Sequence, residues 1–306
     1  MSINFLIVGF GKIGAEHLKA IRKIKKQKTV WIYDDYLTCT TLSLKNDLII
    51  KVNKINQIPK NKKIHFLIMS GLARDRYKLT KIILKRHSVN NILLEKMVFS
   101  KSIEVKKFIK SEFFKSDNIY VNTWSSNLLN KFNISFNNRK SFKIKSILPR
   151  ENYLNNLCHL IEMFKFLIKK SDFLIISNKV DNLINVNNKY SICGGEIILK
   201  SDQRQMLIRS KKIQKGDIEM LCYVNNELLE KIIITSDFKL LHMKKKNKIF
   251  EEKCLKFPKI KKTTYKFIND ILKKKKSDLT LFKDHSNSAY TLLKSFEKLK
   301  KKVIFK

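Results

Sequence analysis

Hydrophobic residues in the first part of the chain fall into short apolar runs that alternate with segments of helical spacing. The runs, which predict buried strands, lie at residues 5–8, 29–33, 64–69, 91–94 and 118–122. Apolar positions three or four residues apart predict helices after residue 12, at 77–85 and at about 103–113. Strands that alternate with helices indicate a doubly wound parallel sheet, so we expect an α/β domain over residues 1–122.

The pattern changes after residue 150. One helical segment extends to about residue 170, and short strand-like runs then follow one another with polar turns between them. These runs lie at 173–176, 196–199, 206–209, 219–224, 231–235 and 238–243, and two further helical patterns occupy about 263–275 and 286–301. Successive strands without intervening helices favour an antiparallel sheet, so residues 123–306 are expected to form an α+β domain with a mostly antiparallel sheet.

Three of the seven glycines in the chain lie in one hexapeptide between the first predicted strand and the first predicted helix. Its residues are Gly9, Phe10, Gly11, Lys12, Ile13 and Gly14. The first glycine of such a turn permits the tight bend, the second lets the backbone approach a diphosphate, and the third lets the helix pack on the strand. This order of strand, glycine turn and helix predicts a dinucleotide site and an N-terminal Rossmann domain.

Asp34 ends the next predicted strand, twenty residues after Gly14. A carboxylate at this place accepts hydrogen bonds from the adenosine ribose and repels a 2′-phosphate. We therefore predict NAD as the cofactor and NADP as the less favoured one, although Lys12 and other lysines nearby weaken this preference. Strand ends gather at one edge of a parallel sheet. The further residues expected at that edge to bind the cofactor are Ser70, Gly71, Glu95 and Lys96.

The sequence resembles the Gfo/Idh/MocA family of oxidoreductases, named after glucose-fructose oxidoreductase and inositol dehydrogenase. The resemblance rests on the segment from Gly9 to His17, on the acidic end of the second strand, and on Glu95-Lys96 after a later strand. Members of the family have Glu-Lys-Pro there, whereas Met97 replaces the proline in this chain. We interpret His17 as a structural residue.

A second part of the resemblance lies on the predicted helix after residue 150. The family has an Asp-x-x-x-His motif there, and His159 matches the histidine while Asn155 replaces the aspartate. Glu162, one turn later, matches an acidic position that is common in the family. Asn155 can hydrogen-bond to a ring one turn away but supplies no charge.

The resemblance implies an NAD(P)-dependent oxidoreductase of sugars, polyols or nucleotide-activated sugars, with surface polysaccharide synthesis as one setting. Lys96 would orient the substrate hydroxyl, His159 would take its proton, and Asn155 would assist. The resemblance also implies a homodimer or homotetramer that assembles through the C-terminal sheet.

Other interpretations remain open at the sequence level. Met97 and Asn155 are also consistent with a noncatalytic NAD-binding or partner-binding protein derived from this family. His159 could be an ordinary histidine of an amphipathic helix, and Asn155 could cap that helix.

Charge and cysteine content narrow the classes of partner. The chain has 65 Lys and Arg against 26 Asp and Glu, a net charge of +39, but only eight of the basic residues are Arg. A lysine excess of this kind is typical of an A/T-rich genome, so we predict no specific nucleic-acid partner. Polyanion binding through the lysines is a third hypothesis, besides the oxidoreductase and the noncatalytic protein.

The five cysteines are too scattered for a disulfide framework or a zinc site, and we predict no metal. The chain lacks an apolar run of about 18 residues and the features of a signal peptide, so we expect a soluble cytoplasmic protein without membrane contact.

Overall fold

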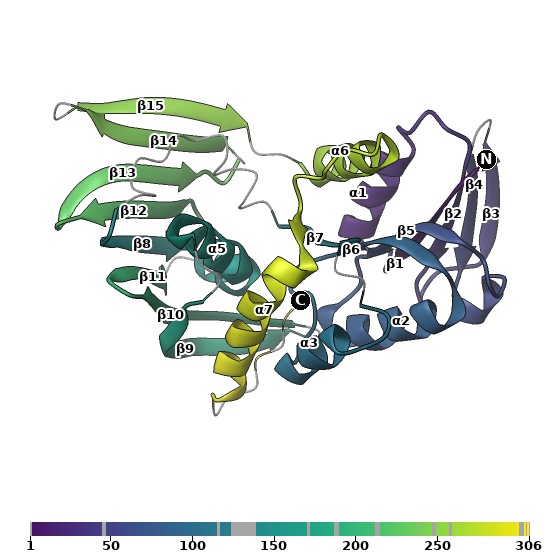
Figure 1. The fold of residues 1–306 in the computed structure, drawn as a ribbon, viewed down its shortest axis with the longest axis horizontal. Coiled ribbons are helices and arrows are strands. Elements are labelled where there is room, and N and C mark those ends of the chain that lie inside the picture. The colour runs from purple at the N-terminus through teal and green to yellow at the C-terminus, as the bar shows by residue number, and fades with distance from the viewer. Residues whose placement is uncertain are drawn as a thin grey trace. The chain divides into compact units, whose positions relative to one another are not determined.

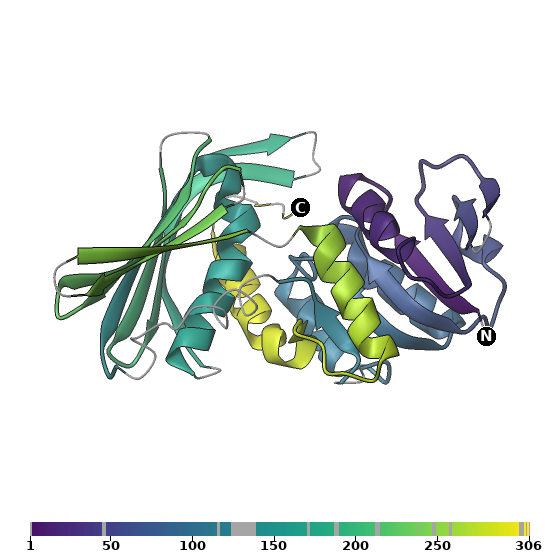
Figure 2. The same ribbon diagram turned by 90° about the horizontal axis from the view of Figure 1, so that it is seen from above.

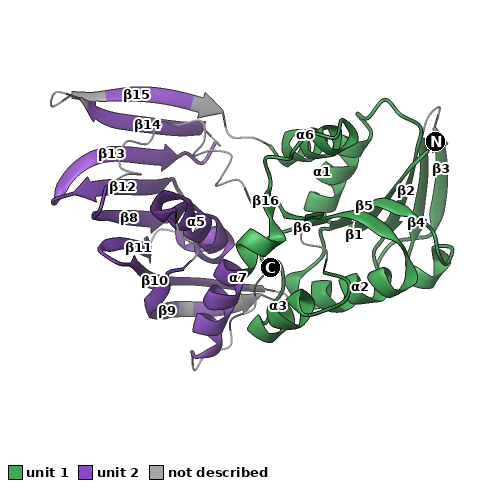
Figure 3. Ribbon diagram, viewed as in Figure 1, with its two compact units in different colours: residues 1–123, 258–286 green, residues 124–257, 287–306 purple. Residues whose placement is uncertain are grey.

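The structure is a computed structural model. It describes residues 2–44, 47–114, 117–123, 139–169, 172–186, 190–211, 215–237, 239–246, 249–256, 259–299, 303 and 305. The chain forms two compact units (Figure 3). The first combines residues 1–123 with 258–286, and the second combines residues 124–257 with 287–306.

The first unit is built on an eight-stranded sheet, sheet A. Its strands are β1 (Ile3–Val8), β2 (Lys28–Tyr33), β3 (Thr40–Leu44), β4 (Asp47–Val52), β5 (Ile64–Met69), β6 (Val89–Leu94), β7 (Ile119–Val121) and β16 (Thr280–Leu281). Its helices are α1 (Lys12–Ile21), α2 (Ala73–Arg86), α3 (Ser102–Ile109), α6 (Ile260–Leu272) and the start of α7 (Phe282–Glu297), with a 3-10 turn η1 at Ile55–Gln57.

The strand order of sheet A is β16-β7-β6-β5-β1-β2-β4-β3. The six inner strands run parallel to one another, and the two edge strands, β3 and β16, are antiparallel to their neighbours. The order reverses direction at β1, which is the doubly wound arrangement of a Rossmann domain. The predicted α/β class of this part is therefore confirmed.

Strands β3 and β4 lie where the sequence predicted no element. Thr41 and Ser43 of β3 are exposed, as is Leu42, so this edge strand has no buried apolar run that would mark it. Pairing with β4, rather than burial, holds it in place.

Helices cover both faces of sheet A (Figure 1). On one face, α1 and α6 pack side chains such as Ile21 and Phe267 against Phe5 and Phe66 of the sheet. Helices α2 and α3 lie on the other face, where the ring of Phe108 packs edge-on against neighbouring aromatic rings. Covering both faces explains why the inner strands are almost continuously apolar.

Residues 258–286 pack with the first unit, whereas the sequence pattern favoured a second domain over residues 123–306. The reason is the apolar side of α6. The ring of Phe267 lies 6.0 Å from that of Phe66 and 4.9 Å from that of Tyr120, both on the sheet. This face of sheet A would be partly exposed without α6, and nothing local in residues 258–286 indicates which sheet they cover.

The second unit is built on sheet B, also of eight strands, in the order β15-β14-β13-β12-β8-β11-β10-β9. The strands are β8 (Phe142–Leu148), β9 (Leu174–Val186), β10 (Tyr190–Ser201), β11 (Arg204–Ser210), β12 (Ile218–Val224), β13 (Glu227–Ile234), β14 (Lys239–Lys246) and β15 (Ile249–Lys256). A 3-10 turn η2 (Arg150–Asn152) leads into helix α5 (Tyr153–Ile168), which packs on one face of the sheet. Only β8 and β11 pair in parallel, so the predicted mostly antiparallel sheet is confirmed, although β8 and β15 were not predicted.

Three further features of the described residues bear on function. No helix among them has the length and apolar character needed to cross a lipid bilayer. Each of the five cysteines has a free thiol. No group of three His, Cys, Asp or Glu side chains in this part of the chain is arranged to hold a metal ion.

Candidate dinucleotide site

The glycine-rich turn connects β1 to α1, and two of its glycines are required by close packing. Gly9 has a φ of +89°, and a Cβ built there would lie 2.4 Å from the backbone of Gly71. A Cβ on Gly14 would lie 2.2 Å from the carbonyl oxygen of Gly9. Both positions therefore exclude any side chain, as the hexapeptide pattern predicts.

Gly11 differs from its two neighbours in the motif because its Cβ would meet no atom within 4 Å. It is the N-cap residue of α1, and no side chain caps this helix or places an acidic group in its first turn. The first N–H groups of a helix have no partner within the helix and carry a partial positive charge. Open space beside an uncapped helix start is the arrangement that suits a diphosphate.

Asp34 lies against the same turn. Its Oδ2 accepts a hydrogen bond of 2.7 Å from the backbone N–H of Phe10, and its Oδ1 accepts one of 3.1 Å from the N–H of Tyr36. The carboxylate is half-buried and held from two sides, so its direction is fixed. A fixed carboxylate beside the turn is the group that ribose hydroxyls require.

Ser70 and Gly71 follow β5 and support the turn from the next strand. The Ser70 hydroxyl donates to the carbonyl oxygens of Gly9 at 2.7 Å and Val8 at 3.1 Å. The backbone N–H groups of Ser70 and Gly71 both donate to Val8. These bonds hold the glycine-rich turn in place, and direct contact of Ser70 or Gly71 with a cofactor stays a prediction.

Glu95, after β6, is buried in a hydrogen-bonded network within the first unit. Its Oε1 lies 3.0 Å from Nε2 of His17 and accepts a 2.5 Å bond from the Asn122 amide. The other ring nitrogen of His17 lies 2.8 Å from the hydroxyl of Thr264 on α6. Burial raises the pKa of Glu95, but the hydrogen bonds from His17 and Asn122, with the charges of His17 and Arg76, outweigh burial and leave the pKa below its usual value. His17 is thus structural in its contacts, and a contact of Glu95 with the cofactor stays a prediction.

Arg76, on α2, was not singled out from the sequence, yet it is fully buried. Its guanidinium donates to the carbonyl oxygens of Gly71 (2.6 Å), Glu95 (2.6 Å), Val98 (3.2 Å) and Met97. It therefore ties the turn that carries Lys96 to the turn after β5. Burial lowers the pKa of Arg76 to about 10, which still leaves it charged at neutral pH. An arginine in a helix gives no sequence signal for such a role.

The three residues predicted to be catalytic belong to different units. Lys96 is half-buried in the turn after β6 of the first unit. His159 and Asn155 lie on α5 of the second unit, where His159 is 1% exposed and the exposed Asn155 amide donates to the carbonyl of Glu151 at 3.4 Å. Their joint action stays a prediction.

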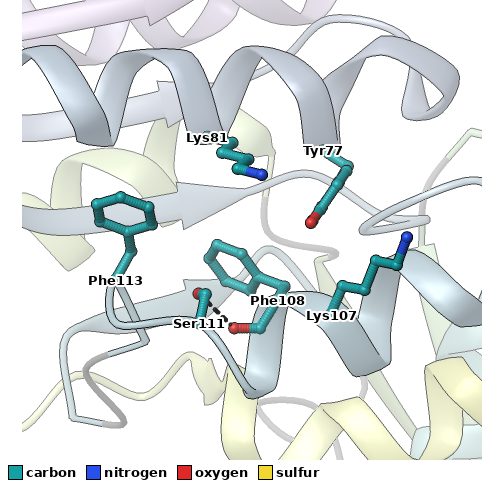
Figure 4. A pocket seen from close by; sticks show the side chains of 6 residues that line it. All are labelled: Tyr77, Lys81, Lys107, Phe108, Ser111 and Phe113. Carbon is teal, nitrogen blue, oxygen red and sulfur yellow. Dashed lines mark hydrogen bonds between the residues drawn. The ribbon is translucent and has the colours of Figure 1, made fainter.

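Two cavities of the first unit lie apart from these residues. One, of about 340 Å³, lies between α2 and α3 (Figure 4) and is lined by Tyr77, Lys81, Lys107, Phe108, Ser111 and Phe113. The other, of about 430 Å³, lies between α1 and α6 and is lined by Lys23, Lys261, Lys262 and Tyr265. None of the predicted site residues lines either cavity. The glycine-rich turn and the strand ends, rather than these cavities, define the candidate site.

Known proteins resemble this chain in their fold and share little of its sequence. No protein-family model matches the chain, and no curated protein matches it. Among solved structures, a probable oxidoreductase, yhhX, is similar with a TM-score of 0.67 and 12% identity over 99% of both chains. A dehydrogenase (MviM) from Clostridium difficile is similar with a TM-score of 0.61 and 12% identity, over 96% of this chain and 98% of that one. A third similar structure is KijD10, a 3-ketoreductase from Actinomadura kijaniata in complex with TDP-benzene and NADP. It has a TM-score of 0.65 and 10% identity, over 97% of this chain and 98% of that one.

These structures are described as an oxidoreductase, a dehydrogenase and a ketoreductase. The fold expected from the resemblance is therefore confirmed along nearly the whole chain.

Proposed function

We propose that this protein is an NAD-dependent oxidoreductase that transfers a hydride between a sugar, polyol or nucleotide-activated sugar and the nicotinamide. The observation that carries the proposal is the open space at Gly11, beside the uncapped start of α1 and next to the Asp34 carboxylate. The two flanking glycines are required by packing, whereas the space at Gly11 has no packing role within the described residues. A bound diphosphate would occupy this space, which would explain why position 11 has no side chain.

Asp34 carries the proposed preference for NAD. Its two oxygens are held by backbone N–H groups, so the carboxylate cannot turn away from an incoming ligand without losing a hydrogen bond. A 2′-phosphate would meet this negative charge at short range, whereas ribose hydroxyls would donate to it. The bound NADP of KijD10 belongs to that protein, and a direct comparison of the two cofactors is the appropriate test here.

The proposed chemistry uses Lys96 and His159 of this chain. A nicotinamide cofactor held by the glycine-rich turn and Asp34 would supply the acceptor, at its C4, for the hydride that leaves the carbinol carbon of the substrate with the bonding electron pair. The hydroxyl proton of the substrate passes to His159, so the carbinol becomes a carbonyl. The ammonium group of Lys96 stabilises the negative charge that develops on the substrate oxygen, and Asn155 supports His159 without adding charge.

The first test is a titration of the purified protein with NADH and with NADPH, followed by nicotinamide fluorescence at moderate salt. Salt screens the general attraction of the lysines for phosphate. We expect saturable binding with NADH preferred, and Asp34→Ala should reduce this preference. The cofactor proposal is wrong if neither nucleotide binds, and Asp34 does not select if the unmutated protein binds both equally.

The second test is a screen of sugars, polyols and nucleotide-activated sugars for NAD reduction. Lys96→Ala and His159→Ala should each abolish turnover while NADH binding is retained. A variant with unchanged turnover would remove that residue from the mechanism. If NADH binds but no substrate is turned over, and Asn155→Asp creates turnover, the chain is the noncatalytic family derivative that Met97 and Asn155 suggest.

We also propose that sheet B mediates self-association. Phe142 of β8 contacts α5, so the alternate residue Lys145 faces away from that helix, and register places Leu207 and Leu221 beside it. This face carries no helix among the described residues (Figure 2). A mixed apolar and basic face of this kind supports a contact between two copies of the chain.

A further inference from the structure

We propose that the ring of Tyr36 stacks on the adenine of the dinucleotide. The inference rests on the proposed function, because it assigns a residue to one part of that cofactor. Tyr36 lies in the turn after β2, two residues beyond Asp34, and its side chain is 90% exposed.

Tyr36 differs from the other exposed hydrophobic residues because its side chain is aromatic. The described part of the chain exposes eight large hydrophobic side chains, and Tyr36 is the sole aromatic among them; the others are Leu42, Ile82, Ile103, Ile109, Leu174, Ile176 and Ile184. Single exposed hydrophobic residues need no explanation, and the aliphatic ones are of that sort. Tyr36 is also the most exposed of the eight, and it lies beside the candidate ribose site.

Other aromatic residues of this region cannot take the same role. Tyr33 is 7% exposed, and its hydroxyl donates to Asp35. Trp31 is 4% exposed, with the Lys62 ammonium 5.5 Å from its ring centre. Tyr36 is thus the ring that β2 and its following turn leave available to a ligand.

The chemistry of adenosine brings the base to Tyr36. Adenine is bonded to C1′ of the ribose, next to the C2′ hydroxyl, so a carboxylate that binds the ribose hydroxyls also fixes where the base lies. The Oδ1 of Asp34 accepts a 3.1 Å hydrogen bond from the backbone N–H of Tyr36. The group that would hold the ribose is therefore directly bonded to the backbone that carries the ring.

Stacking on Tyr36 would also contribute to binding of the adenine without requiring hydrogen bonds to the base. An adenine has two flat faces, and aromatic side chains bind them without regard to a particular hydrogen-bond pattern. Substitution of such an aromatic by alanine usually weakens binding by roughly five- to a hundred-fold. Tyr36 would therefore strengthen binding of the adenosine half of the dinucleotide and leave binding of the nicotinamide half unaffected.

The test uses ADP-ribose and nicotinamide mononucleotide as separate probes of the two halves, measured by calorimetry. Tyr36→Ala should weaken ADP-ribose binding by roughly five- to a hundred-fold, whereas Tyr36→Phe should retain it, because the ring is kept and only the hydroxyl is lost. Binding of nicotinamide mononucleotide should be the same in all variants. Leu42→Ala is the matched control, since Leu42 is 49% exposed on the nearby edge strand.

A spectroscopic readout separates stacking from a general effect on the turn. The adenine H2 and H8 resonances of bound ADP-ribose should shift upfield through the ring current of Tyr36, and this shift should vanish in Tyr36→Ala. Unchanged ADP-ribose affinity in Tyr36→Ala would overturn the inference while leaving the proposed function intact. Failure of the unmutated protein to bind ADP-ribose or NADH would overturn both.

Discussion

His17 and Glu95 form a buried pair, with 3.0 Å between Nε2 and Oε1. His17 lies on α1 just after the glycine-rich turn, and Glu95 lies directly before Lys96, so the pair joins the two segments on which the proposed function depends. Thr264 on the other side of the imidazole brings α6 into the same network.

Glu95→Gln should destabilise the protein in a pH-dependent way. Because the pKa of Glu95 lies below its ordinary value of 4.5 in the folded state, the ionised carboxylate stabilises the fold above that value. This contribution is lost as pH falls through the lowered pKa. At neutral pH the free energy of unfolding should fall by about 1–3 kcal/mol. Urea titrations of both proteins from pH 7 downward should show the difference shrinking in acid, and a difference independent of pH would refute an ionised Glu95.

The glycines of the turn should separate folding from binding. Gly11→Val should change the free energy of unfolding by less than about 1 kcal/mol, because nothing lies near its Cβ, and yet abolish NADH binding. Gly14→Ala should destabilise by about 1–3 kcal/mol, since its Cβ would overlap the Gly9 carbonyl. Thermal melts and NADH titrations of both variants provide the check. Normal NADH binding by Gly11→Val would show that no diphosphate lies there.

Arg76→Lys should loosen the turn that carries Lys96. A lysine has one nitrogen in place of the fork that reaches four carbonyls, so some of these buried oxygens lose their donor. We expect a loss of about 1.5–3 kcal/mol and faster hydrogen exchange in the turn after β6. Arg74→Lys is the matched control on the same helix, because Arg74 is exposed and its guanidinium lies 3.3 Å from the Asp75 carboxylate, a pairing that a lysine can also make. Equal effects of the two substitutions would contradict the role given to Arg76.

Leu207→Lys should dissociate the proposed assembly. The new ammonium would lie beside Lys145 on the face of sheet B that α5 does not cover, so a contact between two copies through this face would have to bury a second positive charge there. Light scattering after size exclusion should show a smaller mass than that of the unmutated protein. Ile103→Lys, at an exposed position of α3, should leave the mass unchanged. A monomeric unmutated chain would rule out this surface as an assembly site.

Local patterns predicted a large part of the fold. The segment from β1 through the glycine-rich turn to α1 has a signal in adjacent residues, namely an apolar run, closely spaced glycines and helical spacing. Strand β8 was missed because Lys143 and Lys145 interrupt its apolar residues, and burial of only one face gives that alternation. Strand β3 was missed because it is exposed.

The candidate site was predictable only in part, for a related reason. Asp34 could be placed at the turn because its position at a strand end is a property of the sheet order. The bonds of Arg76 to the carbonyls of the turn after β6 and of His17 to Thr264 join separate elements of the chain, and neither residue type predicts them. The same applies to α6, whose amphipathic pattern shows that it covers a sheet but not which one.

The return of residues 258–286 to the first unit has a consequence for synthesis on the ribosome. The N-terminal sheet emerges first, but α6, which covers Phe66 and Tyr120, is translated only after nearly all of the second unit. At roughly 5–20 residues per second, the nascent chain would carry an uncovered apolar face for on the order of ten seconds or more. Chaperone binding to stalled nascent chains should therefore persist until α6 has left the exit tunnel, and a fragment ending at residue 122 should aggregate rather than fold.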